Sequence, residues 1–321
     1  MSVGTANKGF SPARWAAGAH AQTVLGAVLP RVVSLPGADV HDVEVEAGTR
    51  VRLLCHWAAA GTRAPTVLLL HGLEGSAQSG FMRGMAFHAL AAGCNAVRMN
   101  MRNCGGTEHL SRTLYHSGLS GDVRAVVEWL AARGHGRLGL AGYSMGGNMV
   151  LKLAAEGAPP SVRAVATVCP ATDLDAAATQ LHRPVNRAYE LFFLAGLLRR
   201  HARKARRVPD AYPRLVRGLP RSVREFDEVV TAPAFGFAGA ADYYARAAAG
   251  PRVGEIKVPA LVIHAADDPF VPLTHAVRAA MNANPAITLD APARGGHCGF
   301  CEGAASFWAE RRVVAFLAER V

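Results

Sequence analysis

Hydrophobic residues along the chain follow two alternating patterns. Residues 66–70 form a continuous apolar run and residues 162–168 a mostly apolar one, which is typical of strands covered on both faces of a parallel sheet. Over residues 81–90 and 122–130, apolar side chains recur every three or four positions, which predicts helices with one buried face. Because strands and helices alternate, we expect an α/β fold with a mostly parallel, doubly wound sheet that binds ligands beyond the carboxyl ends of its strands.

A different pattern precedes these elements. Residues 40–46 and 51–56 alternate between apolar and polar side chains around a Gly-Thr turn, which predicts an antiparallel hairpin at the edge of the sheet. The chain has 321 residues, of which 50% are hydrophobic, and this is ample for one large core. We therefore predict a single domain over residues 1–321. Further strands are expected at residues 95–99, 138–141, 260–264 and 287–289.

The spacing of the predicted strands is interrupted once. About 90 residues separate the strand that ends near Cys169 from the strand at Ala260, whereas a crossover connection needs only a dozen or more. We expect residues 172–255 to form a helical lid inserted within the single domain rather than a second domain. The insertion contains an apolar run and then six basic residues, namely Arg199, Arg200, Arg203, Lys204, Arg206 and Arg207.

Two interpretations of these six basic residues stay open. They can be solvated residues at the end of a helix, where the helix dipole favours positive charge. They can also form a peripheral contact with an anionic membrane beside an apolar entrance. Co-sedimentation with vesicles separates the two, since equal and negligible binding with and without anionic lipid excludes membrane contact.

The net charge of +11 does not by itself indicate a nucleic-acid partner. Only four of the 35 basic residues are lysine, a bias that resembles genomic codon usage. No zinc-finger, helix-turn-helix or RNA-stacking motif accompanies the arginines. We therefore expect no nucleic-acid partner.

Cysteine usage and hydropathy predict a soluble, cytoplasmic protein. The six cysteines are dispersed along a chain that is too long to depend on a disulfide framework, so reduced thiols are expected. The apolar segment 15–29 is interrupted by His20 and Gln22 and makes a poor signal peptide. The longest uncharged apolar stretches fall short of the ~20 residues that a spanning helix needs.

The first candidate for chemistry is Ser144, in the sequence Gly-Tyr-Ser-Met-Gly at residues 142–146. An apolar strand precedes this pentapeptide and an apolar helix comes after it. A serine at such a turn is held in a strained conformation that exposes its hydroxyl, and the glycines avoid collisions with the neighbouring strand and helix. The alternative is a glycine-rich turn with an unremarkable serine.

A nucleophilic serine needs a base, and the base needs an acid that fixes its tautomer. Downstream of Ser144, the strand at residues 260–264 leads to Asp267 and Asp268, and two glycines precede His297. We favour Asp268 as the acid because the sequence Asp-Pro-x-Val-Pro is its usual setting, with Asp267 as the alternative. Both aspartates could instead cap the next helix, and His297 could be an ordinary loop histidine.

Acyl transfer also requires donors for the developing oxyanion. The backbone N–H of Met145, directly after the serine, is one candidate. The other is the N–H of Leu73, which comes after His71 and Gly72 at the end of the strand at residues 66–70.

Several further motifs accompany the three candidate residues. Together they resemble the YheT-like branch of the α/β-hydrolases, which is related to eukaryotic α/β-hydrolase-domain lipases and esterases. The resemblance covers nearly the whole chain. The motifs occupy residues 20–23, 100–108, 114–118, 142–148, 225–228, 231–233, 242–244 and 295–300.

The resemblance implies an α/β-hydrolase fold and a serine carboxylesterase or lipase-like enzyme that acts on lipid-like or other acyl esters. It implies a catalytic triad of Ser144, Asp268 and His297, without metal or organic cofactor. Two alternatives remain: an acyltransferase in which an alcohol or thiol replaces water, and a non-catalytic lipid- or protein-binding module on the same fold.

Overall fold

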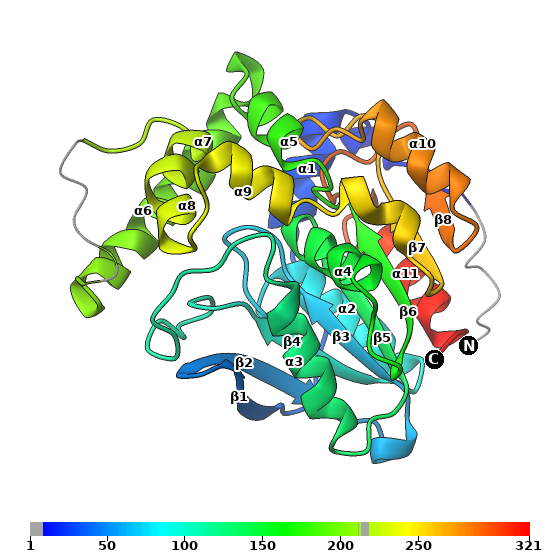
Figure 1. Ribbon diagram of the computed structural model, residues 1–321. Helices are drawn as coiled ribbons and strands as arrows, with labels where there is room; N and C mark the ends of the chain where they lie inside the picture. Colours follow the sequence, from blue (N-terminus) through cyan, green and yellow to red (C-terminus); the bar gives the residue numbers. More distant parts are fainter. Residues whose placement is uncertain (1–8, 211, 213–217) are drawn as a thin grey trace.

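The computed structural model describes residues 9–210, 212 and 218–321 (Figure 1). The predicted domain over 1–321 and the predicted insertion over 172–255 also include residues 1–8, 211 and 213–217, which lie outside the described residues.

Eight strands form one sheet in the order β1-β2-β4-β3-β5-β6-β7-β8. β2 pairs antiparallel with β1 and β4, and every other neighbouring pair is parallel. The predicted α/β fold with an antiparallel hairpin at the sheet edge is therefore confirmed. The strands are β1 (Asp39–Glu46), β2 (Thr49–His56), β3 (Thr66–Leu70), β4 (Asn95–Asn100), β5 (Leu138–Tyr143), β6 (Val162–Val168), β7 (Ala260–Ile263) and β8 (Ile287–Asp290), with a separate pair β9 (Cys301–Gly303) and β10 (Ser306–Phe307).

Helices cover both faces of the sheet. Alternate residues of a strand point to opposite faces. Accordingly, Leu68 and Leu70 of β3 pack in one core with α3, α4 and α10, whereas Val67 and Leu69 pack in the other with α2 and α11. Burial on both sides explains the continuous apolar runs of the central strands. The bounds are α1 (Ala19–Val28), α2 (Gly80–Ala91), α3 (Ser120–Ala131), α4 (Met145–Ala155), α10 (His275–Ala283) and α11 (Trp308–Ala318), with 3-10 helices at η1 (Arg14–Ala16) and η2 (Gly61–Arg63).

The helix predicted from residue 122 begins two residues earlier, at Ser120. Asp122 does not cap this helix. Its carboxylate accepts two hydrogen bonds from the buried guanidinium of Arg102, at 2.5 and 2.7 Å. The acidic residue therefore fixes the loop after β4.

Helices fill the described part of the insertion between β6 and β7. Figure 1 shows α5 to α9 gathered at one end of the sheet. Leu194, Phe226 and Tyr244 of the insertion share an apolar cluster with Leu114 and Phe270 of the α/β body. The insertion therefore packs on the body through apolar contacts. Its elements are α5 (Leu174–Leu181), η3 (Pro184–Asn186), α6 (Arg187–Arg207), α7 (Val223–Phe226), the π-helix η4 (Asp227–Thr231), α8 (Ala232–Ala234), α9 (Ala240–Ala247) and η5 (Gly250–Glu255).

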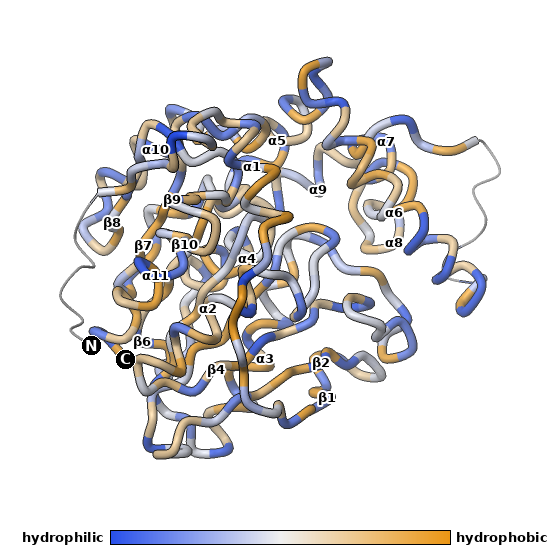
Figure 2. The backbone as a smooth tube through the Cα atoms, turned by 180° about the vertical axis from the view of Figure 1, so that it is seen from behind, coloured by the Kyte–Doolittle hydropathy of each residue, from blue (hydrophilic) through white to orange (hydrophobic). Residues whose placement is uncertain are grey.

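The basic end of α6 is only partly exposed. Hydrophilic residues gather there (Figure 2), and Arg199, Arg203, Arg206 and Arg207 are exposed. Arg200 and Lys204 are buried, however, so they are not available to a membrane surface. The six-residue surface predicted from the sequence is therefore corrected to four residues, and their contact with anionic lipid stays a prediction. Among the described residues, no helix is both long and apolar enough to cross a bilayer.

Candidate active site

Ser144 lies at the turn between β5 and α4, with a φ of 51°. This conformation is rare for a residue with a side chain. The turn is tight because Gly142 and Gly146 lack a Cβ. A Cβ on Gly142 would lie closer than 3.0 Å to backbone atoms of Gly146, and a Cβ on Gly146 would collide with the carbonyl oxygens of Leu70 and His71. The sequence pattern therefore reflects close backbone packing that exposes the serine side chain.

Replacing Gly146 by alanine is expected to lower the free energy of unfolding by about 1–3 kcal/mol or more, because backbone must move to admit the methyl group. Urea denaturation measures the effect. Gly121→Ala is the matched control, since Gly121 lies in α3 and a Cβ there meets nothing within 4 Å. This control is expected to be neutral or up to about 1 kcal/mol more stable. Equal stability of the two variants would contradict the close packing of the turn.

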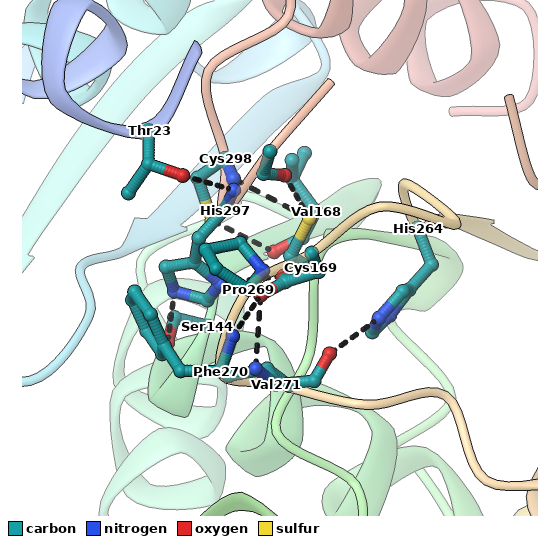
Figure 3. A network of polar contacts seen from close by, with 12 residues as sticks. Thr23, Ser144, Val168, Cys169, His264, Pro269, Phe270, Val271, His297 and Cys298 are labelled. Carbon is teal, nitrogen blue, oxygen red and sulfur yellow. Dashed lines mark hydrogen bonds and ion pairs between the residues drawn. The ribbon is translucent and has the colours of Figure 1, made fainter. Parts of the chain in front are cut away.

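Three side chains from distant parts of the chain meet beside this turn, and Figure 3 shows Ser144 and His297 among them. Ser144 Oγ lies 3.0 Å from Nε2 of His297, and Nδ1 of His297 lies 2.7 Å from Oδ2 of Asp268. A carboxylate only accepts, so Nδ1 carries the proton and Nε2 is free to accept from the serine hydroxyl. Burial alone would raise the pKa of Asp268, but the charge and hydrogen bond of His297 outweigh it and hold that pKa below its usual value.

The neighbouring aspartate has a different contact. Asp267 accepts a hydrogen bond from the backbone N–H of Gly296 at 2.8 Å, which holds the loop before His297. Asp268 also accepts from the backbone N–H groups of Phe270 and Val271, at 3.1 and 2.9 Å. Of the two candidates from the sequence, the structure therefore pairs Asp268 with the imidazole.

The N-terminal helix α1 holds the backbone of His297 in place through a hydrogen bond. The backbone N–H of His297 donates to the Thr23 hydroxyl at 2.8 Å. Gly296 approaches this helix so closely that a Cβ would lie 2.7 Å from the same hydroxyl oxygen. Thr23 belongs to one of the family motifs noted in the sequence, but nothing in its local pattern indicated this role.

Leu73 and Met145, whose backbone N–H groups are the predicted oxyanion donors, line the same cavity as Ser144. Met145 begins α4, where the first N–H groups of a helix have no intrahelical acceptor. Leu73 comes directly after Gly72, whose added Cβ would lie 3.2 Å from Ser144 Cβ and 3.8 Å from its Oγ. Both predicted oxyanion donors therefore belong to backbone beside the serine. A site with two N–H groups near a nucleophile suits charge that develops on a carbonyl oxygen.

His71 holds the loop that contains Leu73. Its Nε2 accepts from the backbone N–H of Met101 at 3.1 Å, and its Nδ1 donates to the carbonyl of Gly72 at 2.8 Å. Burial lowers the pKa of His71 to about 4, so the imidazole is neutral near pH 7. His71 therefore shapes the loop.

A cavity of about 110 Å³ extends from Ser144 between the body and the insertion. Its walls are mostly apolar and include Leu174, Leu197 and Val223 from the insertion. Asp227 also lines it and accepts hydrogen bonds from Thr231 at 2.7 Å and from Tyr244 at 2.8 Å. Burial outweighs these two hydrogen bonds and raises the pKa of Asp227 to about 6.

One group of potential metal ligands occurs in the described part of the chain. The ligand atoms of Cys169, His297 and Cys298 lie within 4.8 Å of one another. His297 is already engaged by Asp268 and Ser144, and burial raises the pKa of the Cys298 thiol, which disfavours the thiolate that a metal requires. The absence of a metal or organic cofactor in the working enzyme stays a prediction.

The sequence matches a known family and several named proteins. Residues 65–304 match the family model of the alpha/beta hydrolase fold. The chain is 32% identical to YheT of Escherichia coli, named as a candidate esterase, over 96% of this chain and 92% of that protein. It is also 32% identical to the phospholipase ABHD3 of Mus musculus, over 77% of this chain and 61% of that protein. A medium-chain fatty acid ethyl ester synthase/esterase 2 of Saccharomyces cerevisiae is 30% identical, over 78% of this chain and 61% of that protein.

Solved structures resemble the fold. The 2,6-dihydroxy-pseudo-oxynicotine hydrolase has a TM-score of 0.61 and 19% identity, over 89% of this chain and 68% of that one. The Pyrococcus furiosus esterase Pf2001 has a TM-score of 0.57 and 18% identity, over 91% of this chain and 98% of that one. At these identities the structures establish the fold alone. Together with the family match, they show that the chain belongs to the α/β-hydrolase family, in the YheT-like branch whose named relatives are hydrolases of the esterase and lipase type.

Proposed function

We propose that this protein is a serine carboxylic ester hydrolase that works through an acyl-enzyme. Ser144 attacks the ester carbonyl while Nε2 of His297 takes the hydroxyl proton, and Asp268 stabilises the resulting imidazolium. His297 then gives the proton to the leaving alcohol. Water attacks the acyl-enzyme with His297 again as base, and the N–H groups of Leu73 and Met145 hold the oxyanion in both steps.

The observation that carries this proposal is the continuous hydrogen-bond relay from Ser144 through His297 to Asp268. A serine hydroxyl is a weak nucleophile at neutral pH unless a base accepts its proton during attack. Here the base lies within reach, and its tautomer is fixed by a carboxylate whose side chain is only 2% exposed. The same relay serves each proton transfer in the cycle.

The cavity beside Ser144 suggests which esters fit. At about 110 Å³ and with mostly apolar walls, it suits a short apolar acyl group. The insertion supplies much of its apolar lining, and we therefore propose that residues 172–255 act as a lid. Slower amide exchange in α6 with bound phenylboronic acid would support the lid, and unchanged exchange would count against it.

A panel of p-nitrophenyl esters with acyl chains of increasing length tests the proposed activity. We expect hydrolysis by the wild-type protein, with kcat/KM highest for short acyl groups and lower for long acyl chains. Repeating the assay with added alcohol acceptors distinguishes hydrolysis from acyl transfer, since a transferase forms the new ester in preference to free acid. The proposed function fails if the wild type hydrolyses no ester in the panel.

A further inference from the structure

One buried ion pair joins the insertion to the loop that carries the Leu73 N–H. Glu74 is the next residue after Leu73, and Arg200 lies on α6. The guanidinium donates from Nε to Oε1 of Glu74 at 3.0 Å and from Nη2 to Oε2 at 3.2 Å. The two side chains are only 7% and 10% exposed. Two parallel contacts at a buried position distinguish this pair from an exposed surface ion pair.

The Tyr115 hydroxyl links the carboxylate of Glu74 to the backbone N–H of the same residue. The backbone N–H of Glu74 donates to the Tyr115 hydroxyl at 3.0 Å, and that hydroxyl donates to Oε1 of Glu74 at 2.7 Å. Glu74 has a φ of 56°, a left-handed conformation that is unfavourable for a residue with a Cβ. Its carboxylate therefore helps to hold the backbone in an unusual turn immediately after Leu73.

Groups from α6 and from neighbouring loops pack closely around the Arg200–Glu74 ion pair. Arg200 also donates to the backbone carbonyl of Asn103, and its guanidinium lies 5.4 Å from the centre of the Tyr115 ring. One turn earlier on α6, Gly196 leaves room for Glu74, because an added Cβ would lie 2.5 Å from Oε2. Without the guanidinium, the carboxylate would lose its charged partner at a largely buried position and would have to move.

We propose that Arg200 is a positioning residue for ester hydrolysis. Through Glu74 it fixes the backbone that directs the Leu73 N–H toward the oxyanion, so that catalysis depends on the docking of α6 against this loop. This inference rests on the proposed hydrolase function. Because an oxyanion donor acts where charge develops in the transition state, its misplacement lowers kcat more than it weakens substrate binding.

The direct test compares Arg200→Met with Arg112→Met. Arg112 also forms an ion pair with a residue of the insertion, Asp210, but both side chains are more than half exposed, at 65% and 68%. We expect Arg200→Met to lower kcat per folded protein by about 10–100-fold, less than the 10²–10³ seen when an oxyanion donor is removed. KM for a short p-nitrophenyl ester should change by less than about threefold, and Arg112→Met should resemble the wild type.

Inhibition by phenylboronic acid provides a second readout. Its tetrahedral adduct with the serine places an oxygen where the oxyanion forms, so Ki should rise in Arg200→Met by about the factor by which kcat/KM falls. A merely structural role of Arg200 would reduce the amount of folded protein without changing kcat or Ki of the folded fraction. A folded Arg200→Met variant with wild-type kcat and Ki overturns the inference.

Arg200→Lys decides the question if Arg200→Met does not fold. Lysine keeps the charge but loses the two-pronged contact, so a loss of at least about threefold in kcat supports the inference. Wild-type kcat and Ki in Arg200→Lys overturn it. These outcomes are distinct from failure of the proposed function, in which the wild type itself hydrolyses no ester.

Discussion

Replacing Ser144 by alanine is expected to lower kcat for a short p-nitrophenyl ester by about 10⁴–10⁶-fold, because the acyl-enzyme cannot form without the hydroxyl. The residual rate would come from oxyanion stabilisation and binding by the rest of the site. Steady-state kinetics with an ester in excess over KM measures the loss. Alanine keeps the Cβ of Ser144 and therefore the same strained backbone, so thermal unfolding of the variant should show a stability close to that of the wild type.

Ser120→Ala is the matched control for this prediction. Ser120 is buried, and its hydroxyl donates to Glu156 at 2.6 Å at the start of α3, outside the triad. Its removal should leave kcat close to the wild-type value. Unchanged ester hydrolysis in Ser144→Ala would overturn the proposed mechanism, whatever the control shows.

Asp268→Asn is expected to lower kcat by about 10⁴-fold. The substitution preserves the size of the side chain, but an amide can donate to Nδ1 of His297 and so favours the tautomer that leaves Nε2 protonated. An imidazole in that tautomer cannot accept the Ser144 proton. The loss should appear in kcat, whereas KM for a short ester should change little.

The adjacent aspartate provides a close control for Asp268. Asp267→Asn alters the contact with the backbone N–H of Gly296 and leaves the imidazole pair intact. It should therefore cost no more than about tenfold in kcat, through a small displacement of the loop. If Asp267→Asn were the more damaging of the two, the assignment of Asp268 as the acid would be wrong.

The sheet and the three central side chains could be predicted because their signals are local in sequence. Buried parallel strands are continuous apolar runs such as residues 66–70. The turn around Ser144 requires glycines at fixed offsets. Asp268 and His297 lie in loops after predicted strands, and parallel strands bring the loops at their carboxyl ends to one edge of the sheet. The choice between Asp267 and Asp268 needed the structure. The two adjacent residues have the same chemical group and differ only in where their side chains point.

The contacts of the insertion could not be predicted in the same way. The basic residues after residue 198 resemble a solvated helix end, yet Arg200 binds Glu74 and Lys204 donates to the backbone carbonyls of Glu108 and Ser111. These partners lie about a hundred residues away along the chain, where sequence spacing carries no information. One signal was present: Gly196, Arg200 and Lys204 are four residues apart and therefore share a helix face.

The central claim is that Ser144 is the nucleophile, and covalent labelling tests it most directly. A fluorophosphonate is incubated with the native protein, and the modified peptide is identified by mass spectrometry. We predict one label on Ser144, which is absent from Ser144→Ala and from wild-type protein unfolded before the reaction. Ester hydrolysis by a protein that takes no label, or takes it on another residue, would contradict the account.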